Sequence, residues 1–120
     1  MRSNWIEHQG RKIFYQDFSN HFYHSEVVKA ELAEVQKIVL AQPLGSTLIL
    51  SDFRDTNVGS DLLPAMNAAS AATKSYVRKT AVLGVTGMKR KLADLLTALT
   101  GQPLKYFDDI ESAKNWLIED

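Results

Sequence analysis

The chain has 120 residues, of which 45% are hydrophobic, and this length and composition suit a single globular domain over residues 1–120. Fourteen basic residues balance fourteen acidic ones, so the formal net charge is zero and no overall field favours nucleic acid as a partner. The absence of cysteine excludes disulfides, thiolate metal sites and cysteine nucleophiles. No apolar run approaches the ~18 residues that a membrane span needs, which predicts a cytoplasmic protein without a membrane span.

The first third of the chain is expected to form a β-hairpin and then a helix. Two strand-like runs, residues 5–8 and 12–15, flank a turn at Gln9–Arg11. The helix is expected to begin at Ser25, whose hydroxyl can cap it, and to stop near Gln42, because a proline and a glycine follow. Its apolar positions recur as on one face of a helix: Val28, Leu32, Val35 and Val39.

The rest of the chain alternates short apolar runs with helical patterns. The expected strands are residues 47–50, 82–85 and 104–107, and the expected helices are one capped by Asp61 and two more at residues 88–99 and 110–118. Such alternation implies βαβ units and a mostly parallel sheet. Together with the hairpin, it predicts an α/β domain with a mixed sheet of about four to five strands and about four helices.

Sites in such a sheet form beyond the carboxyl ends of the strands, where this sequence places several carboxylates. Asp108 and Asp109 follow the last strand, but the pattern does not match a response-regulator phosphorylation site. That site needs an acidic pair after the first strand and a lysine after the last one. Asp108 is instead predicted to cap the last helix, with Glu111 at position N3.

A glycine turn leads into a run of cations at the expected start of a helix, Lys89, Arg90 and Lys91. Because a helix N-terminus is already partly positive, it opposes each nearby cation by about 0.3–1 kcal/mol. The turn lacks the glycine pattern of a P-loop or of a dinucleotide site. Two interpretations stay open: a solvated basic face, or a site for an anion or an acidic partner made by Thr86, Gly87, Lys89 and Arg90.

No metal site, cofactor or catalytic group is expected. His21 and His24 are spaced for one face of a helix, but no third ligand has a spacing that would complete a zinc site. No serine lies in a Gly-x-Ser-x-Gly elbow, and no nucleophile has a base at a recognisable spacing. The chain is therefore not expected to be an enzyme.

Five segments of the chain carry a family resemblance. They are YQDFS at 15–19, LSD at 50–52, AVLGVTGMK at 81–89, GQPLKYFD at 101–108 and AKNWL at 113–117. These segments resemble the bacterial STAS-like group, the small domains similar to SpoIIAA, and the likeness covers nearly the whole chain. The resemblance implies a mixed sheet with helices packed against it, and a non-enzymatic role in binding and signalling like that of anti-sigma-factor antagonists.

The resemblance also implies a site. In those antagonists, a serine at the start of the second helix is phosphorylated within an Asp-Ser-Ser/Thr-Gly-like run. The corresponding residues 55–61 read DTNVGSD, so Thr56 and Ser60 are the candidate phosphoacceptors. The loop after the third strand and the second helix are expected to bind a protein partner, such as a kinase-like or anti-sigma regulator, and a homodimer stays open. The candidate partner-binding residues are Arg54, Asp55, Asn57 and Asp61.

A second function class stays open beside partner binding. The wider superfamily resembles lipid-carrier folds, which implies a domain that binds a small ligand or a lipid. Such a ligand would use an apolar pocket or the basic helix start at Lys89 and Arg90. An apolar cavity would favour this alternative, whereas a filled core with an exposed loop patch would favour a protein partner.

Overall fold

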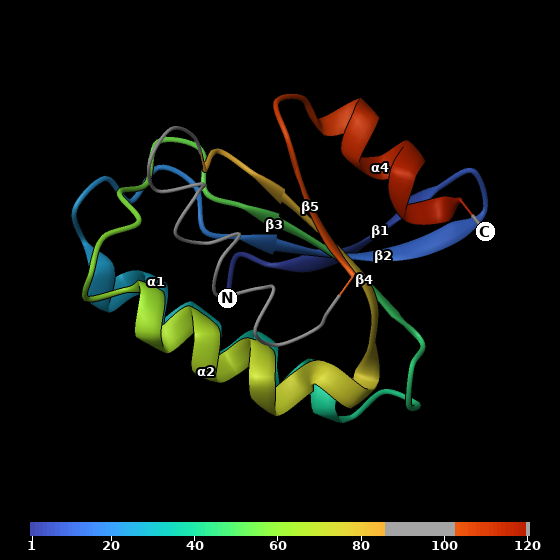
Figure 1. Cartoon of the computed structure of the whole chain (residues 1–120), viewed down its shortest axis with the longest axis horizontal. Coiled ribbons are helices and arrows are strands. Elements are labelled where there is room, and N and C mark those ends of the chain that lie inside the picture. The colour runs from blue at the N-terminus through green and yellow to red at the C-terminus, as the bar shows by residue number, and fades with distance from the viewer. Residues whose placement is uncertain (86–102, 120) are drawn as a thin grey trace.

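A five-stranded sheet in the order β1-β2-β3-β4-β5 forms the centre of the fold (Figure 1). The computed structural model describes residues 1–85 and 103–119 of the chain. The strands are β1 (Asn4–His8), β2 (Arg11–Asp17), β3 (Thr47–Asp52), β4 (Val77–Leu83) and β5 (Leu104–Phe107). β1 pairs antiparallel with β2 and the other neighbours are parallel, which confirms the expected mixed and mostly parallel sheet.

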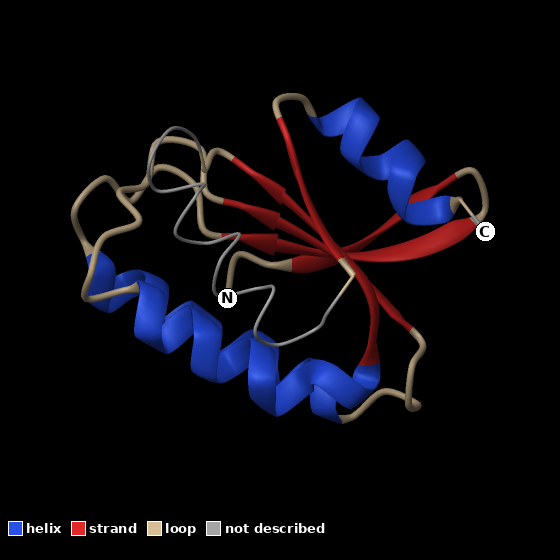
Figure 2. Cartoon of the chain, viewed as in Figure 1, coloured by secondary structure: helices blue, strands red, loops and turns tan. Residues whose placement is uncertain are grey.

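Helices cover both faces of the sheet, so the elements form three layers (Figure 2). α1 (Ser25–Leu40) and α2 (Leu63–Thr73) lie on one face, and α4 (Ile110–Ile118) lies on the other. A short 3-10 helix (Lys74–Tyr76) joins α2 to β4. The described residues thus contain three α-helices, and the further helix expected at residues 88–99 lies outside them.

Successive side chains of each strand point to opposite faces of the sheet, and this builds two apolar cores. The core under α4 contains Ile13, Leu48, Leu50, Ala81, Leu83, Ala113 and Leu117. The core under α1 and α2 includes Phe14, Phe18, Ile49, Phe53, Val82, Val85 and the α1 stripe of Val28, Leu32, Val35 and Val39. The apolar face expected for the helix at residues 25–42 is therefore confirmed as buried.

The strand expected at residues 82–85 begins much earlier, at Val77, and this part of the prediction was wrong. The apolar run that marked the strand in the sequence starts only at residues 81–82, after two cations. Lys79 instead reaches the end of α4, where its Nζ donates to the carbonyl oxygens of Trp116 at 2.9 Å and Glu119 at 2.8 Å. Its charge complements the negative end of the helix dipole, so a cation is accommodated within β4.

Three helix starts also differ from the expectation. Ser25 does not cap α1, because its Oγ donates to the Asp61 carboxylate. Asp61 in turn accepts this bond across the loop and does not cap α2. α4 is capped by Asp109 and not by Asp108, since the Asp109 carboxylate accepts from the Ser112 N–H at 2.8 Å. Asp109 has the extended backbone that suits this position.

Candidate functional site

The loops after β2 and β3, residues 18–24 and 53–62, lie side by side at the carboxyl end of the sheet (Figure 1). Their main chains continue the parallel pairing of the two strands through hydrogen bonds of 2.9 Å. These bonds run from Phe18 N to Asp52 O, from Asn20 N to Arg54 O and from Phe22 N to Asp55 O. The two segments are named the loop face.

Two aromatic side chains of the loop face stand in solvent. Phe22 is 58% exposed and Tyr23 is 82% exposed. The backbone of Phe22 has a φ of 48°, and the φ angles of Asn20 and Asp55 are also positive, at 60° and 58°. A bulky residue in this left-handed region stores about 1–3 kcal/mol of strain, which the surrounding hydrogen bonds must hold. Sequence reasoning missed both aromatics, because their exposure depends on this backbone conformation.

The two candidate phosphoacceptors have different surroundings. Thr56 is buried, and its Oγ1 donates to Phe18 O while it accepts from His21 N at 3.1 Å. A phosphate on Thr56 would replace both bonds, which hold the two loops together. Ser60 is exposed. Of the two candidates, Ser60 is therefore the one whose hydroxyl a kinase could reach without opening the loop face.

A buried carboxylate at the end of β3 holds Arg54. The Asp52 side chain is 0% exposed and accepts from Arg54 Nη2 at 2.7 Å and from the Tyr15 hydroxyl at 2.6 Å. Burial alone would raise the pKa of Asp52, but the hydrogen bonds from Arg54 and Tyr15 outweigh it and hold the pKa below its ordinary value. Burial and the hydrogen bond to Asp52 raise the pKa of Tyr15. Arg54 is thus fixed by an ion pair, although 51% of its side chain is exposed.

The other predicted partner-binding residues also belong to the loop face. Asp55 and Asp61 are exposed, and Asn57 is half-buried. The Asp61 carboxylate accepts from Ser25 Oγ at the start of α1, and this bond holds the pKa of Asp61 below its ordinary value. The loop face therefore brings the predicted residues Arg54, Asp55, Asn57 and Asp61 together with the two exposed aromatic rings.

Gly84, directly after the end of β4, lies against the base of the loop face. The φ of Gly84 is 85°, and a Cβ at this position would lie 2.4 Å from Arg54 N and 2.5 Å from the carbonyl carbon of Phe53. Leu83 O accepts from Phe53 N at 2.9 Å. Because glycine alone permits this approach without displacing the main chain, the loop after β3 is fixed at its base by β4 as well as by β2.

No protein-family model matches the sequence, and no curated protein matches it. A solved structure does match: an uncharacterized protein of the DUF3478 family from Shewanella loihica, described as having a SpoIIAA-like fold. The TM-score is 0.72, and the alignment covers 96% of this chain and 91% of that chain at 12% sequence identity. The chain has a SpoIIAA-like fold. The resemblance seen in the sequence is thereby confirmed at the level of the fold.

A second predicted site of this SpoIIAA-like domain lies outside the described residues. Thr86, Gly87, Lys89 and Arg90 belong to the segment 86–102, so the basic helix start stays a prediction. Within residues 1–85 and 103–119, no group of three or more histidine or acidic side chains could hold a metal ion. In the same part of the chain, no helix has both the length and the apolar character to cross a membrane.

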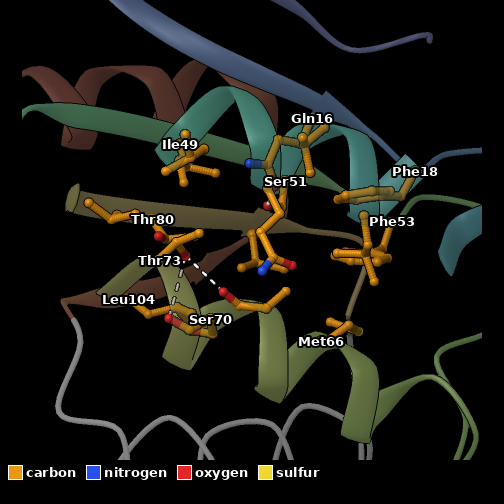
Figure 3. Close-up of a pocket in the computed structure, with 17 residues that line it drawn as sticks. Gln16, Phe18, Ile49, Ser51, Phe53, Met66, Ser70, Thr73, Thr80 and Leu104 are labelled. Atoms are coloured by element: carbon orange, nitrogen blue, oxygen red, sulfur yellow. Dashed lines mark hydrogen bonds between the residues drawn. The ribbon is translucent and has the colours of Figure 1, made fainter. Parts of the chain in front are cut away.

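The SpoIIAA-like domain also contains a cavity of about 100 Å³ between the sheet and the helices α1 and α2 (Figure 3). Its walls include Phe18 and Phe53, whose rings stack with their centroids 4.9 Å apart. An apolar cavity favours a small ligand, and an exposed aromatic loop favours a protein partner. The domain has both features, and they meet at the base of the loop face.

Proposed function

We propose that this SpoIIAA-like domain is a non-enzymatic regulatory module that binds a protein partner through the loop face and the start of α2. The expected partner is a regulatory protein, such as a kinase-like or anti-sigma regulator. The observation that carries the proposal is the exposed pair Phe22 and Tyr23, which the loop pairing sets beside the polar segment Arg54–Asp61.

The two aromatic rings have the character of interface anchors. Aromatic side chains dominate the energetics of many protein interfaces, because they bury a large area and lose little conformational entropy. Phe22 and Tyr23 contribute little to the core of the domain, since most of each side chain is exposed. The surrounding carboxylates and amide would form the polar rim that such anchors usually have.

The loop face is also ordered before a partner arrives. Thr56 joins the two loops, Asp52 holds Arg54, and Asp61 is bonded to Ser25. A surface that is already in its binding conformation has a smaller entropy cost of association. The ordering therefore supports a binding role for the same residues that the sequence indicated.

The charge of the loop face indicates the kind of surface that would fit it. Asp55 and Asp61 are exposed carboxylates, whereas the charge of Arg54 is balanced by Asp52. Within the segment Arg54–Asp61, the exposed charge is therefore mainly acidic. A partner with an apolar pocket and a basic rim would complement this pattern.

Binding can be tested with Tyr23→Ala and the matched control Leu44→Ala. Leu44 is 71% exposed but lies in the loop before β3, away from the loop face. We expect a partner captured by the wild-type domain to bind Tyr23→Ala at least about tenfold more weakly, and Leu44→Ala with nearly unchanged affinity, measured by calorimetry.

A second variant, Phe22→Gly, removes the other ring and keeps a residue that tolerates the positive φ. Circular dichroism would establish that each variant is folded. Equal affinity of the wild type, Tyr23→Ala and Phe22→Gly for the captured partner would contradict the proposed use of the loop face.

Phosphorylation of Ser60 is the regulatory part of the proposal. A phosphate would add roughly −1.5 to −2 charges next to Asp61 and so weaken the bond between Asp61 and Ser25 that supports the loop face. Partner binding should then fall. Intact-mass analysis of the protein from its native host, with Ser60→Ala and Thr56→Val as site controls, would test this. Unphosphorylated protein under all growth conditions would contradict this part.

Small-ligand binding is the second candidate function. The specific observation that favours it is the cavity behind the loop face. A lipid is the other ligand that the sequence left open, and the cavity's size and lining bear on that choice.

A further inference from the structure

We propose that the cavity between the sheet and the helices α1 and α2 is a binding site for a small neutral molecule, about the size of a single ring, with one hydrogen-bond acceptor such as a carbonyl group. This site is separate from partner binding at the loop face and does not rest on it. The proposal is carried by the cavity's volume, by the uncharged character of the described residues that line it and by the Gln16 amide that faces it (Figure 3).

The walls of the cavity come from two layers of the fold. Gln16 and Ser51 project from the sheet, Met66 and Thr73 come from α2, and Phe18 lies at one end (Figure 3). α1 supplies apolar side chains from its buried stripe. The cavity is thus a space that the packing of α2 onto the sheet leaves unfilled.

The volume limits the ligand. A cavity of about 150 Å³ lined by apolar side chains holds a molecule such as benzene, so about 100 Å³ suits roughly four to six non-hydrogen atoms. A long acyl chain needs several times this space. Size therefore favours a small ring or a short branched chain over a lipid.

The lining limits the charge of the ligand. None of the described residues that line the cavity is acidic or basic. A carboxylate or phosphate placed there would lose its hydration without gaining a counter-charge, which is strongly unfavourable. The ligand that fits is therefore uncharged.

Gln16 explains why the ligand should carry an acceptor. Its side chain is 93% buried, at 7% exposure, and its Oε1 accepts from Ser51 Oγ at 3.1 Å. Among the described residues, no other partner is found for the Gln16 side chain, so its amide nitrogen is left to donate into the cavity. This nitrogen is not among the fully buried unpaired atoms, so it reaches accessible space, where a carbonyl oxygen of a ligand could accept from it.

The test uses the full chain, labelled with nitrogen-15, and four probes. Cyclopentanone has the expected size and a carbonyl group, and cyclopentane lacks the carbonyl. Isobutyrate is a charged carboxylate with the same number of non-hydrogen atoms as cyclopentanone, and phosphatidylcholine vesicles supply a lipid. We expect cyclopentanone to cause saturable amide shifts around Gln16, Ser51 and Ala69, with a dissociation constant of about 1 mM or tighter. Cyclopentane should bind at least about fivefold more weakly, and the carboxylate and vesicles should cause no saturable shift at these residues.

Two variants of α2 locate the site. Ala69 lines the cavity, so Ala69→Met should fill it and abolish the cyclopentanone shifts. Ala68 is exposed on the same helix and does not line the cavity, so Ala68→Met should bind like the wild type. Gln16→Leu should bind cyclopentane and cyclopentanone equally.

Three results would overturn the proposal. They are the absence of saturable shifts with cyclopentanone, unchanged binding to a folded Ala69→Met, and binding of the carboxylate or the vesicles as tight as that of cyclopentanone. The comparison of the probes is made on the wild-type chain, so it decides the question even where a variant fails to fold.

Discussion

The two faces of the central sheet are packed to different degrees. Under α4, Leu50, Leu83, Ala113 and Leu117 are all fully buried. On the other face, Phe14, Val28 and Leu62 are equally buried, but α2 itself buries only Thr73 and a cavity of about 100 Å³ remains. The comparison teaches that the core under α4 is filled, whereas the packing of α2 onto the sheet leaves a space in a core that is otherwise well buried.

The largest expected effect comes from removing a buried side chain from the core under α4. Leu83→Ala should lower the free energy of unfolding by about 2–5 kcal/mol, because the side chain is fully buried and the tight surroundings cannot collapse onto the space. Urea denaturation measures this loss. Leu44→Ala, at an exposed position, is the control. A loss below about 1 kcal/mol for Leu83→Ala would show that the α4 face is not the filled one.

The junction between β4 and the loop face should be almost as sensitive. In Gly84→Ala, the new Cβ would lie 2.4 Å from Arg54 N, and the left-handed backbone adds about 1–3 kcal/mol of strain. We expect a loss of stability of roughly 2–4 kcal/mol together with weaker partner binding. Gly45→Ala shares the positive φ without a nearby atom, so it isolates the strain from the clash. Equal losses in the two variants would contradict the role given to the close approach.

The same enlargement should act in opposite directions on the two faces. Ala113→Met adds volume to the filled core under α4 and should cost about 1–3 kcal/mol. Ala69→Met adds volume beside the cavity and should stabilise the domain by up to about 1 kcal/mol. Thermal unfolding of both variants gives the sign directly. Destabilisation of the same size in both would remove the contrast between the faces.

The last prediction concerns the carboxylate of Asp52, which lies between the core and the loop face. The folded pKa of Asp52 lies below its ordinary value of 3.8, so its carboxylate stabilises the fold above the unfolded pKa. This contribution is lost as the pH falls through the folded pKa. Asp52→Asn should therefore cost about 1–2 kcal/mol at neutral pH, and the difference from the wild type should shrink below about pH 4. Parallel curves of stability against pH would contradict the ion pair.

Much of the fold could be predicted because its signals are local. The hairpin, the strand at 104–107 and the helix at 110–118 follow from turn residues and apolar periodicity, and the structure confirms them. The start of β4 could not be found this way, since Lys79 acquires its role only through α4, which is distant in the sequence. The helix caps predicted at Ser25 and Asp61 were wrong for the same reason. The two side chains are distant in the sequence and form a hydrogen bond with each other instead.

The site was only partly visible in the sequence. The family resemblance indicated the segment from Arg54 to Asp61, and a loop after a central strand is a place where polar residues are expected to act. Phe22 and Tyr23 gave no signal, because the exposure of an aromatic residue depends on the path of the backbone. The cavity gave none either, since a void is the sum of many packing distances and belongs to no single residue.

Phe18 belongs to both of the regions that the proposals concern. Its ring lines the cavity, while its main chain donates to Asp52 O and accepts from Thr56 Oγ1 within the loop face. If the shared residue transmits any energy between the two sites, thermodynamic linkage makes the effect reciprocal. A small molecule that changed the partner's affinity tenfold would have its own affinity changed tenfold by the partner. Measuring the binding of either one, with and without the other, would therefore give the same coupling free energy.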